Sequence, residues 1–329
     1  ETQKLSLLGF SSYYPVQGGD MGSSLTENEG TDADTVDFVE ALAAKGFSIN
    51  EDLQNLYKSL ESEFKTEVNM WGNIVEYYHI TAPATDGVFA SKEPSQETMD
   101  SVDSQWKESM DDYNVMLVTI GRSSTENGTY LPGVDGVDAS QDQIDPLGLS
   151  DDERDLINAA VEAKESNGGK VIVMLNNANA MEIDEIKNND GVDAILEVGL
   201  PGGYGFYGVA DILSGEANPS GHLTDTYAVT NANSPAAQNF GNYEWINADP
   251  TVNINAEEVE AEGIYTGYKY YETRYADTVL GQGNADATVG SSTGKAWDYD
   301  NEVSYPFGYG LSYTTFEQTL KSVDVDLEN

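Results

Sequence analysis

The sequence predicts an α/β protein in which a mostly parallel sheet is sandwiched by helices, followed by an irregular, aromatic-rich C-terminal tail. Apolar residues switch repeatedly between strand-like runs and helix-like spacing from residue 5 to about residue 214. Strands that alternate with helices pair in parallel, because each helix returns the chain to the same end of the sheet. At 329 residues with 39% hydrophobic content, the chain is also long enough to bury a sizeable core.

The predicted strands are short apolar segments bounded by polar residues or glycine. Residues 115–120, Val-Met-Leu-Val-Thr-Ile, form the clearest one, because an unbroken apolar run is typical of a strand covered on both faces. Residues 192–198 have the same character and are expected to form another buried strand. The full set of expected strands is 5–8, 47–49, 115–120, 170–175 and 192–198.

Helices are expected where apolar residues recur every three or four positions and capping residues mark the ends. Ser150 stands before three acids, which suits the positive end of a helix dipole, and Gly168 with Gly169 follows where that helix stops. Gly46 likewise occupies the position of a C-terminal cap. The expected helices cover residues 35–45, 52–64, 95–110, 150–165, 181–187 and 208–213.

The composition changes in the last third of the chain. Residues 281–295 are rich in Gly, Ser, Thr and Asn, and residues 303–316 are rich in aromatic side chains. We expect a sheet domain at residues 1–245 and a C-terminal extension at 246–329 that packs on it, with an exposed loop at 281–300.

The chain is strongly acidic: 15 Lys and Arg stand against 58 Asp and Glu, which gives a formal net charge of −43. A field of that sign repels phosphate backbones and anionic lipids, so neither nucleic acid nor membrane insertion is expected. Neutral ligands such as sugars carry no such penalty. The scarcity of Lys and Arg beside many Tyr, Asn, Ser and Gly favours an extracellular or cell-surface location over a cytoplasmic one. The polar start, Glu-Thr-Gln-Lys, shows no signal peptide and looks trimmed.

No cofactor and no metal are expected. Residues 203–208, Gly-Tyr-Gly-Phe-Tyr-Gly, match the dinucleotide pattern formally, but they follow a late strand and place bulky side chains where a pyrophosphate needs close backbone approach. The chain has no cysteine, and its two histidines, His79 and His222, lack the spacing of zinc ligands.

The strongest candidate for chemistry follows the clearest strand. Residues 121–128 read Gly-Arg-Ser-Ser-Thr-Glu-Asn-Gly, which places Glu126 on a polar loop at the C-terminal end of that strand, the edge at which such sheets bind ligands. Arg122 and the loop amides can orient its carboxylate. From the residues alone, Glu126 is either a solvated loop acid or one of the two carboxylates that a glycosidase needs.

Several blocks, in order, resemble the α/β sandwich domain of family-3 glycoside hydrolases, as found in β-glucosidases. Residues 121–128 resemble the family's acid/base loop, although Thr125 and Asn127 replace expected glycines, and His222 stands where Lys or Arg is usual. The other blocks are residues 11–19, 171–176, 200–202, 210–215, 218–221, 263–271 and 305–316. The details resemble the bacterial subgroup in which this domain precedes the barrel.

The resemblance implies a family-3 (αβ)6 sandwich that carries half of the site of a retaining β-glycosidase. Glu126 would be the acid/base, and Gly19, Asp20 and Arg122 would line the sugar site, binding a β-linked oligosaccharide or glycoside. The family's nucleophile is an Asp in a (β/α)8 barrel of the same polypeptide. No barrel, no matching Ser-Asp-Trp block and no fibronectin-like domain is recognisable here, so the chain alone is expected to be inactive.

Two alternatives stay open. Tyr13 and Tyr14 either stack on sugar rings or pack within the protein. The domain itself is either part of an enzyme or a non-catalytic carbohydrate-binding or surface module of the same fold, which the replaced glycines beside Glu126 allow.

Overall fold

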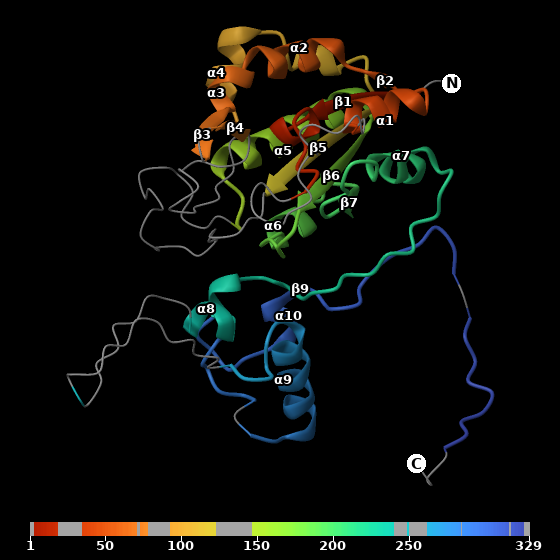
Figure 1. The fold of residues 1–329 in the computed structure, drawn as a ribbon. Coiled ribbons are helices and arrows are strands. Elements are labelled where there is room, and N and C mark those ends of the chain that lie inside the picture. Colours follow the sequence, from red (N-terminus) through yellow and green to blue (C-terminus); the bar gives the residue numbers. More distant parts are fainter. Residues whose placement is uncertain are drawn as a thin grey trace.

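The architecture was obtained as a computed structural model. It describes residues 3–18, 35–70, 73–77, 93–122, 147–239, 249, 262–283, 285–315 and 317–325, with the backbone alone for 66–70 and 73–77. An α/β part occupies the upper half of Figure 1, and a smaller C-terminal part lies below it.

A five-stranded, fully parallel sheet forms the centre of the α/β part, as the sequence predicts. Its order is β2 (Ser48–Ile49), β1 (Lys4–Leu8), β5 (Val115–Arg122), β6 (Lys170–Asn177) and β7 (Ala194–Glu197). The central strands are apolar because both of their faces are covered: Leu7, Leu117 and Val173 are fully buried. The strand predicted at 192–198 is present as β7, but it lies at an edge of the described sheet and its residues are half-buried or exposed, so only its burial was predicted wrongly.

Helices cover this sheet in two packed groups. Helix α1 packs against α7 through the rings of Phe38 and Phe206, whereas α5 packs on β5 and β6 and contacts α4. Because the chain leaves β1 in one direction across the sheet and β5 in the other, right-handed crossovers place α1 and α5 on opposite faces. The helices are α1 (Phe38–Ala44), α2 (Glu51–Ser59), α3 (Glu61–Phe64), α4 (Gln96–Val102), α5 (Asp151–Asn167), α6 (Asp184–Lys187) and α7 (Phe206–Ser214).

Two of the predicted helices are interrupted in the structure. The helix predicted at 52–64 is divided at Leu60 into α2 and α3. The helix predicted at 95–110 ends at Val102, because Asp103 is extended and its carboxylate accepts the N–H of Gln105, and only a 3-10 turn (η2, Glu108–Met110) follows. An antiparallel hairpin, β3 (Thr66–Met70) with β4 (Asn73–Tyr77), was not predicted.

The turn after β1 depends on a glycine. Gly9 has φ of +93°, and a Cβ atom there would lie 2.2 Å from the carbonyl oxygen of Thr119 on β5. A 3-10 turn (η1, Phe10–Ser12) follows, and Ser12 Oγ binds the Leu8 carbonyl at 2.8 Å and Thr119 Oγ1 at 2.7 Å. This close approach fixes the first loop at the end of the sheet where β5 also finishes.

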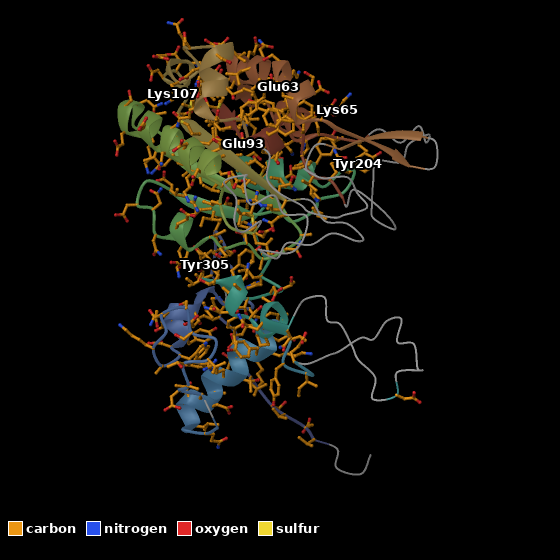
Figure 2. All side chains as sticks on the ribbon, turned by 90° about the vertical axis from the view of Figure 1, so that its left-hand side faces the viewer. Glu63, Lys65, Glu93, Lys107, Tyr204 and Tyr305 are labelled. Carbon is orange, nitrogen blue, oxygen red and sulfur yellow. The ribbon has the colours of Figure 1, made fainter. Side chains whose placement is uncertain are left out.

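The C-terminal lobe comprises β8 (Tyr227–Ala228), η3 (Asn231–Asn233), α8 (Pro235–Asn239), α9 (Tyr268–Leu280), α10 (Tyr299–Glu302) and β9 (Val303–Tyr305). Strands β8 and β9 pair antiparallel beside a small core of Ala228, Tyr271, Trp297 and Val303. The lobe joins the α/β part where Tyr305 lies in Figure 2, and there Lys187 Nζ donates to the Ser304 carbonyl at 2.6 Å. The boundary predicted at residue 245 falls outside the described residues and stays a prediction.

Arg274 on α9 orders much of the segment predicted as a loop at 281–300. Its guanidinium donates to the carbonyl oxygens of Ala285, Ala287 and Val289 and lies 4.8 Å from the centroid of the Trp297 ring. Among the described helices, none has the length and apolar character to cross a membrane.

Candidate functional site

The C-terminal ends of the parallel strands meet at one edge of the sheet, here called the carboxyl edge. Gly9 follows β1, and Arg122, Asn177 and Glu197 end β5, β6 and β7. Of the predicted site residues, only Arg122 lies within the described chain. Gly19, Asp20 and Glu126 lie outside it, so their roles stay predictions.

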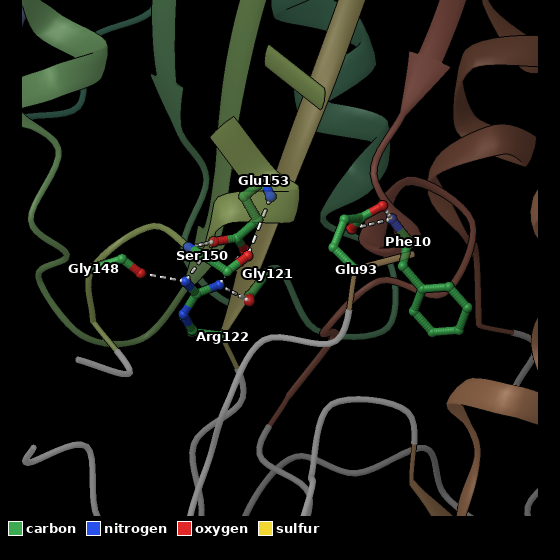
Figure 3. Close-up of polar contacts among 7 residues, drawn as sticks. All are labelled: Phe10, Glu93, Gly121, Arg122, Gly148, Ser150 and Glu153. Atoms are coloured by element: carbon green, nitrogen blue, oxygen red, sulfur yellow. Dashed lines mark hydrogen bonds and ion pairs between the residues drawn. The ribbon is translucent and has the colours of Figure 1, made fainter. Parts of the chain in front are cut away.

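Arg122 forms a buried, bidentate ion pair with Glu153 in the first turn of α5 (Figure 3). Nη1 and Nη2 of the arginine lie 2.6 and 2.9 Å from the two carboxylate oxygens, and the residues are 1% exposed each. Nη1 also donates to the Gly121 carbonyl at 2.8 Å and Nη2 to the Gly148 carbonyl at 2.7 Å. The parallel fork of N–H donors is the geometry in which arginine binds a carboxylate most strongly.

Glu153 serves two structures at once. Its Oε2 accepts the backbone N–H of Ser150 at 2.8 Å, while Ser150 Oγ accepts the N–H of Glu153 at 3.2 Å, which makes a capping box at the start of α5. The Ser-x-x-Glu spacing indicates the cap in the sequence but not the pairing with Arg122. A direct contact between Arg122 and a sugar, as predicted, would need its side chain to leave these partners or to share them.

Glu93 is a second acid at this edge, and it was not among the residues predicted from the sequence. Its carboxylate accepts the N–H of Phe10 (2.8 Å to Oε2) and the hydroxyl of Tyr57 (3.1 Å), which itself accepts the N–H of Gly9. Part of the residue is accessible, yet burial of its carboxylate raises the pKa to about 8, against the lowering effect of the Phe10 N–H. Burial therefore favours the protonated form of Glu93 relative to an exposed glutamate.

Of the two tyrosines for which sugar stacking or internal packing was left open, Tyr13 is buried and Tyr14 is half-buried against the core. Tyr13 is 8% exposed, donates to the Leu7 carbonyl at 2.9 Å and stacks on Tyr57. Tyr14 stacks on Phe10 with ring centroids 4.6 Å apart. These contacts favour the packing alternative for both residues.

Two asparagines end β6 with different surroundings. Asn176 accepts the N–H of Val16 and donates to the carbonyls of Val16 and Gly199, so it joins the loops after β1 and β7. Asn177 is 2% exposed, and neither polar atom of its amide has a hydrogen-bond partner among the residues that the structure describes. Such an unpaired buried amide is rare in proteins and calls for an explanation.

Glu197 connects the carboxyl edge to the C-terminal lobe. It accepts the hydroxyl of Tyr227 at 2.6 Å and the N–H of Gly199 at 2.7 Å. Burial raises the pKa of Glu197 to about 7, although both hydrogen bonds oppose that shift. Within the described ranges, no three His, Cys, Asp or Glu side chains converge as metal ligands.

A parallel sheet between helices, with polar side chains gathered at its carboxyl edge, defines an α/β sandwich domain of the kind that meets its ligand at that edge. The family model described as glycosyl hydrolase family 3 C-terminal domain matches residues 26–313. The chain belongs to this family, which confirms the resemblance inferred from the sequence.

Relatives and solved structures agree with this assignment. A β-glucosidase of Ruminococcus albus is 26% identical over 296 residues, which cover 87% of this chain and 23% of that protein. The structure of β-glucosidase 3B from Thermotoga neapolitana with α-D-glucose aligns with TM-score 0.62 and 26% identity, covering 96% of this chain and 35% of that one. A β-glucosidase from Paenibacillus barengoltzii, 23% identical, shares the fold with TM-score 0.65 over 98% of this chain and 28% of that one. The chain thus spans about a quarter to a third of the length of these three proteins.

Proposed function

We propose that this chain is the acid/base-bearing domain of a retaining β-glycosidase that hydrolyses terminal β-linked sugars, with Glu126 as the acid/base. The observation that carries the proposal is the family-3 match across residues 26–313. It is supported by β5, which ends at Arg122 on the carboxyl edge, four positions before Glu126. The β-glucosidase names of the relatives suggest glucosides as the first substrates to test.

In the proposed mechanism, two carboxylates act on opposite sides of the glycosidic bond. An Asp from a (β/α)8 barrel of the same polypeptide attacks the anomeric carbon, and Glu126 protonates the departing oxygen. Glu126 then removes a proton from the water that hydrolyses the glycosyl-enzyme. The two carboxyl groups must come within about 5–5.5 Å of each other, and Glu126 must be protonated when the substrate binds. Gly19, Asp20 and Arg122 are proposed to line the sugar site.

The charge of the chain suits a neutral substrate. A formal net charge of −43 disfavours phosphorylated or otherwise anionic sugars, whereas a neutral glycoside carries no electrostatic penalty. The same field favours the protonated form of a carboxyl group in the site, which is the form that an acid catalyst needs.

The test is Glu126→Ala in the full-length polypeptide. We expect kcat/KM for a glucoside with a poor leaving group to fall by about 10²- to 10⁴-fold, because general acid catalysis is lost. A dinitrophenyl glucoside, whose leaving group needs little protonation, should lose far less. Azide should restore turnover of the second substrate and give a β-glycosyl azide.

Glu162→Ala is the matched control, because Glu162 is an exposed acid on α5. It should leave both substrates unaffected. The purified 329-residue chain, assayed beside the full-length protein, should show no turnover of the dinitrophenyl glucoside. If Glu126→Ala retains full activity, Glu126 is not the acid/base. If the full-length protein binds sugars but shows no turnover, the domain belongs to a binding module and not to an enzyme.

A further inference from the structure

The ion pair between Arg122 and Glu153 joins the two ends of the segment that carries Glu126. We propose that this buried pair is a positioning device for the general acid/base, an inference that rests on the role proposed for Glu126. Arg122 is the last residue of β5, the segment 123–146 follows, and Gly148, Ser150 and Glu153 stand where the described chain resumes.

The arginine bridges both ends of the segment through one planar group. Nη2 reaches the Gly148 carbonyl at 2.7 Å and Glu153 Oε2 at 2.9 Å, while Nη1 reaches Glu153 Oε1 at 2.6 Å and the Gly121 carbonyl at 2.8 Å. Glu153 Oε2 also accepts the N–H of Ser150 at 2.8 Å. A single guanidinium therefore sets the separation and the relative orientation of the two attachment points (Figure 3). We call this arrangement the Arg122 clamp.

Both attachment points belong to rigid elements. Strand β5 lies between β1 and β6, and α5 is a 17-residue helix with a capping box and a buried face. A bridge between two elements leaves the chain ends that they carry fewer relative positions than ends that move independently. Because catalysis of proton transfer depends on placement within about 1 Å, restricting the ends is an effective way to place an acid on the segment.

A contribution to stability does not by itself explain why an ion pair occupies this position. A buried ion pair stabilises little compared with well-packed apolar residues of similar size, because desolvation offsets the attraction. The two parallel hydrogen bonds between arginine and glutamate instead fix the relative orientation of the two side chains. A lysine, with a single ammonium group, cannot reproduce this geometry.

The experiment measures leaving-group dependence in the full-length enzyme. We expect Arg122→Lys and Glu153→Gln each to lower kcat/KM for an alkyl or other poor-leaving-group glucoside by about 10- to 100-fold. The dinitrophenyl glucoside should change by less than about threefold, since it needs little acid assistance. Loss of activity confined to the poor leaving group is the signature of a misplaced acid.

Arg154→Lys is the matched control. Arg154 lies next to Glu153 on α5 and pairs with Glu185 at 2.8 Å and with Asp151 at 2.7 Å, but its side chain is 41% exposed and, in the described part of the chain, makes no hydrogen bond or ion pair with Arg122 or Glu153. It should leave the ratio of the two kcat/KM values unchanged. Thermal melts followed by circular dichroism show whether each variant folds. If Arg122→Lys does not fold, the substrate comparison with Glu153→Gln tests the clamp.

The possible outcomes separate the two proposals. An equal loss on both substrates after Glu153→Gln, which leaves Arg122 in place, would overturn the clamp and favour a purely structural role for the ion pair. Full activity in both clamp variants would overturn it as well, even if their melting temperatures fall. If Glu126→Ala retains activity on the poor leaving group, the proposed function fails first, whatever the clamp variants show.

Discussion

Neighbouring asparagines at the end of β6 differ in what their amides contact. The amide of Asn176 makes three hydrogen bonds to the loops after β1 and β7, whereas the buried amide of Asn177 makes none within the described ranges of the chain. In a protein interior, an unpaired amide is unfavourable by about 1–3 kcal/mol. Asn177 stands opposite Arg122 in the register of β5 and β6, so this unfavourable group lies beside the Arg122 clamp.

Replacing these two residues by leucine, which has nearly the same shape, should have opposite effects. Asn177→Leu should raise the stability of the protein by about 1–2 kcal/mol, because it removes an unsatisfied polar group. Asn176→Leu should lower the stability by about 2–3 kcal/mol, because the carbonyls of Val16 and Gly199 and the N–H of Val16 lose their hydrogen-bond partner. Thermal unfolding of the purified protein measures both. A loss of stability in Asn177→Leu would indicate a partner for that amide in the folded protein.

At the scale of elements, helix α5 is specified by its ends. Ser150 and Glu153 form the capping box, three acids occupy the first turn, and Gly168 closes the helix with φ of +73°. These signals are local, which is why the sequence analysis predicted this helix well. Glu153 also forms the ion pair of the Arg122 clamp. The residue that caps α5 therefore also ties the start of this helix to the end of β5.

Ser150→Ala should lower stability by about 1 kcal/mol, because the N–H of Glu153 loses the hydroxyl that it binds. Ser166→Ala is the control, since Ser166 is exposed near the other end of the same helix and should change stability by less than about 0.5 kcal/mol. Chemical denaturation of both variants gives the comparison. Equal effects would mean that the capping hydroxyl contributes nothing specific.

Across the whole molecule, acidity and buried carboxyls act in the same direction. The formal charge of −43 makes the folded chain repel itself, and protonation of acids relieves that repulsion. Glu93 and Glu197 have folded-state pKa values of about 8 and about 7, above the ordinary glutamate value of 4.5. Both therefore bind protons more tightly in the folded than in the unfolded protein.

The sign of the pH dependence follows from this difference. Between about pH 4.5 and pH 8 the folded protein holds more protons than the unfolded protein, so stability should fall as pH rises through that window. Melting temperatures measured from pH 5 to pH 8.5 should decrease. The decrease should be smaller in Glu93→Gln, which cannot titrate, than in Glu97→Gln, which removes an exposed acid on α4. Identical slopes in the two variants would mean that Glu93 has an ordinary pKa in the folded protein.

Local pattern was enough to predict most of the central architecture. Apolar runs without polar interruption identified β5 and β6, and caps and glycines identified α1 and α5, because strand burial and helix ends depend on residues within a few positions. Those elements, taken in order, predicted the parallel sheet and the edge at which function was to be sought. The motif blocks then led to family 3, which the family match confirms. Glu126, Gly19 and Asp20 stay predictions.

Only the tertiary structure decided which side chains meet. Glu93 binds Phe10 across 83 positions, and Arg122 binds Glu153 across 31, and no periodicity links residues so far apart. The edge position of β7 and the hairpin of β3 and β4 were likewise set by neighbours in space. The sequence by itself therefore determined the fold class and the strand that leads to the candidate site. The structure decided how that strand is tied to α5, because a buried charge takes its partner from whatever the fold brings within reach.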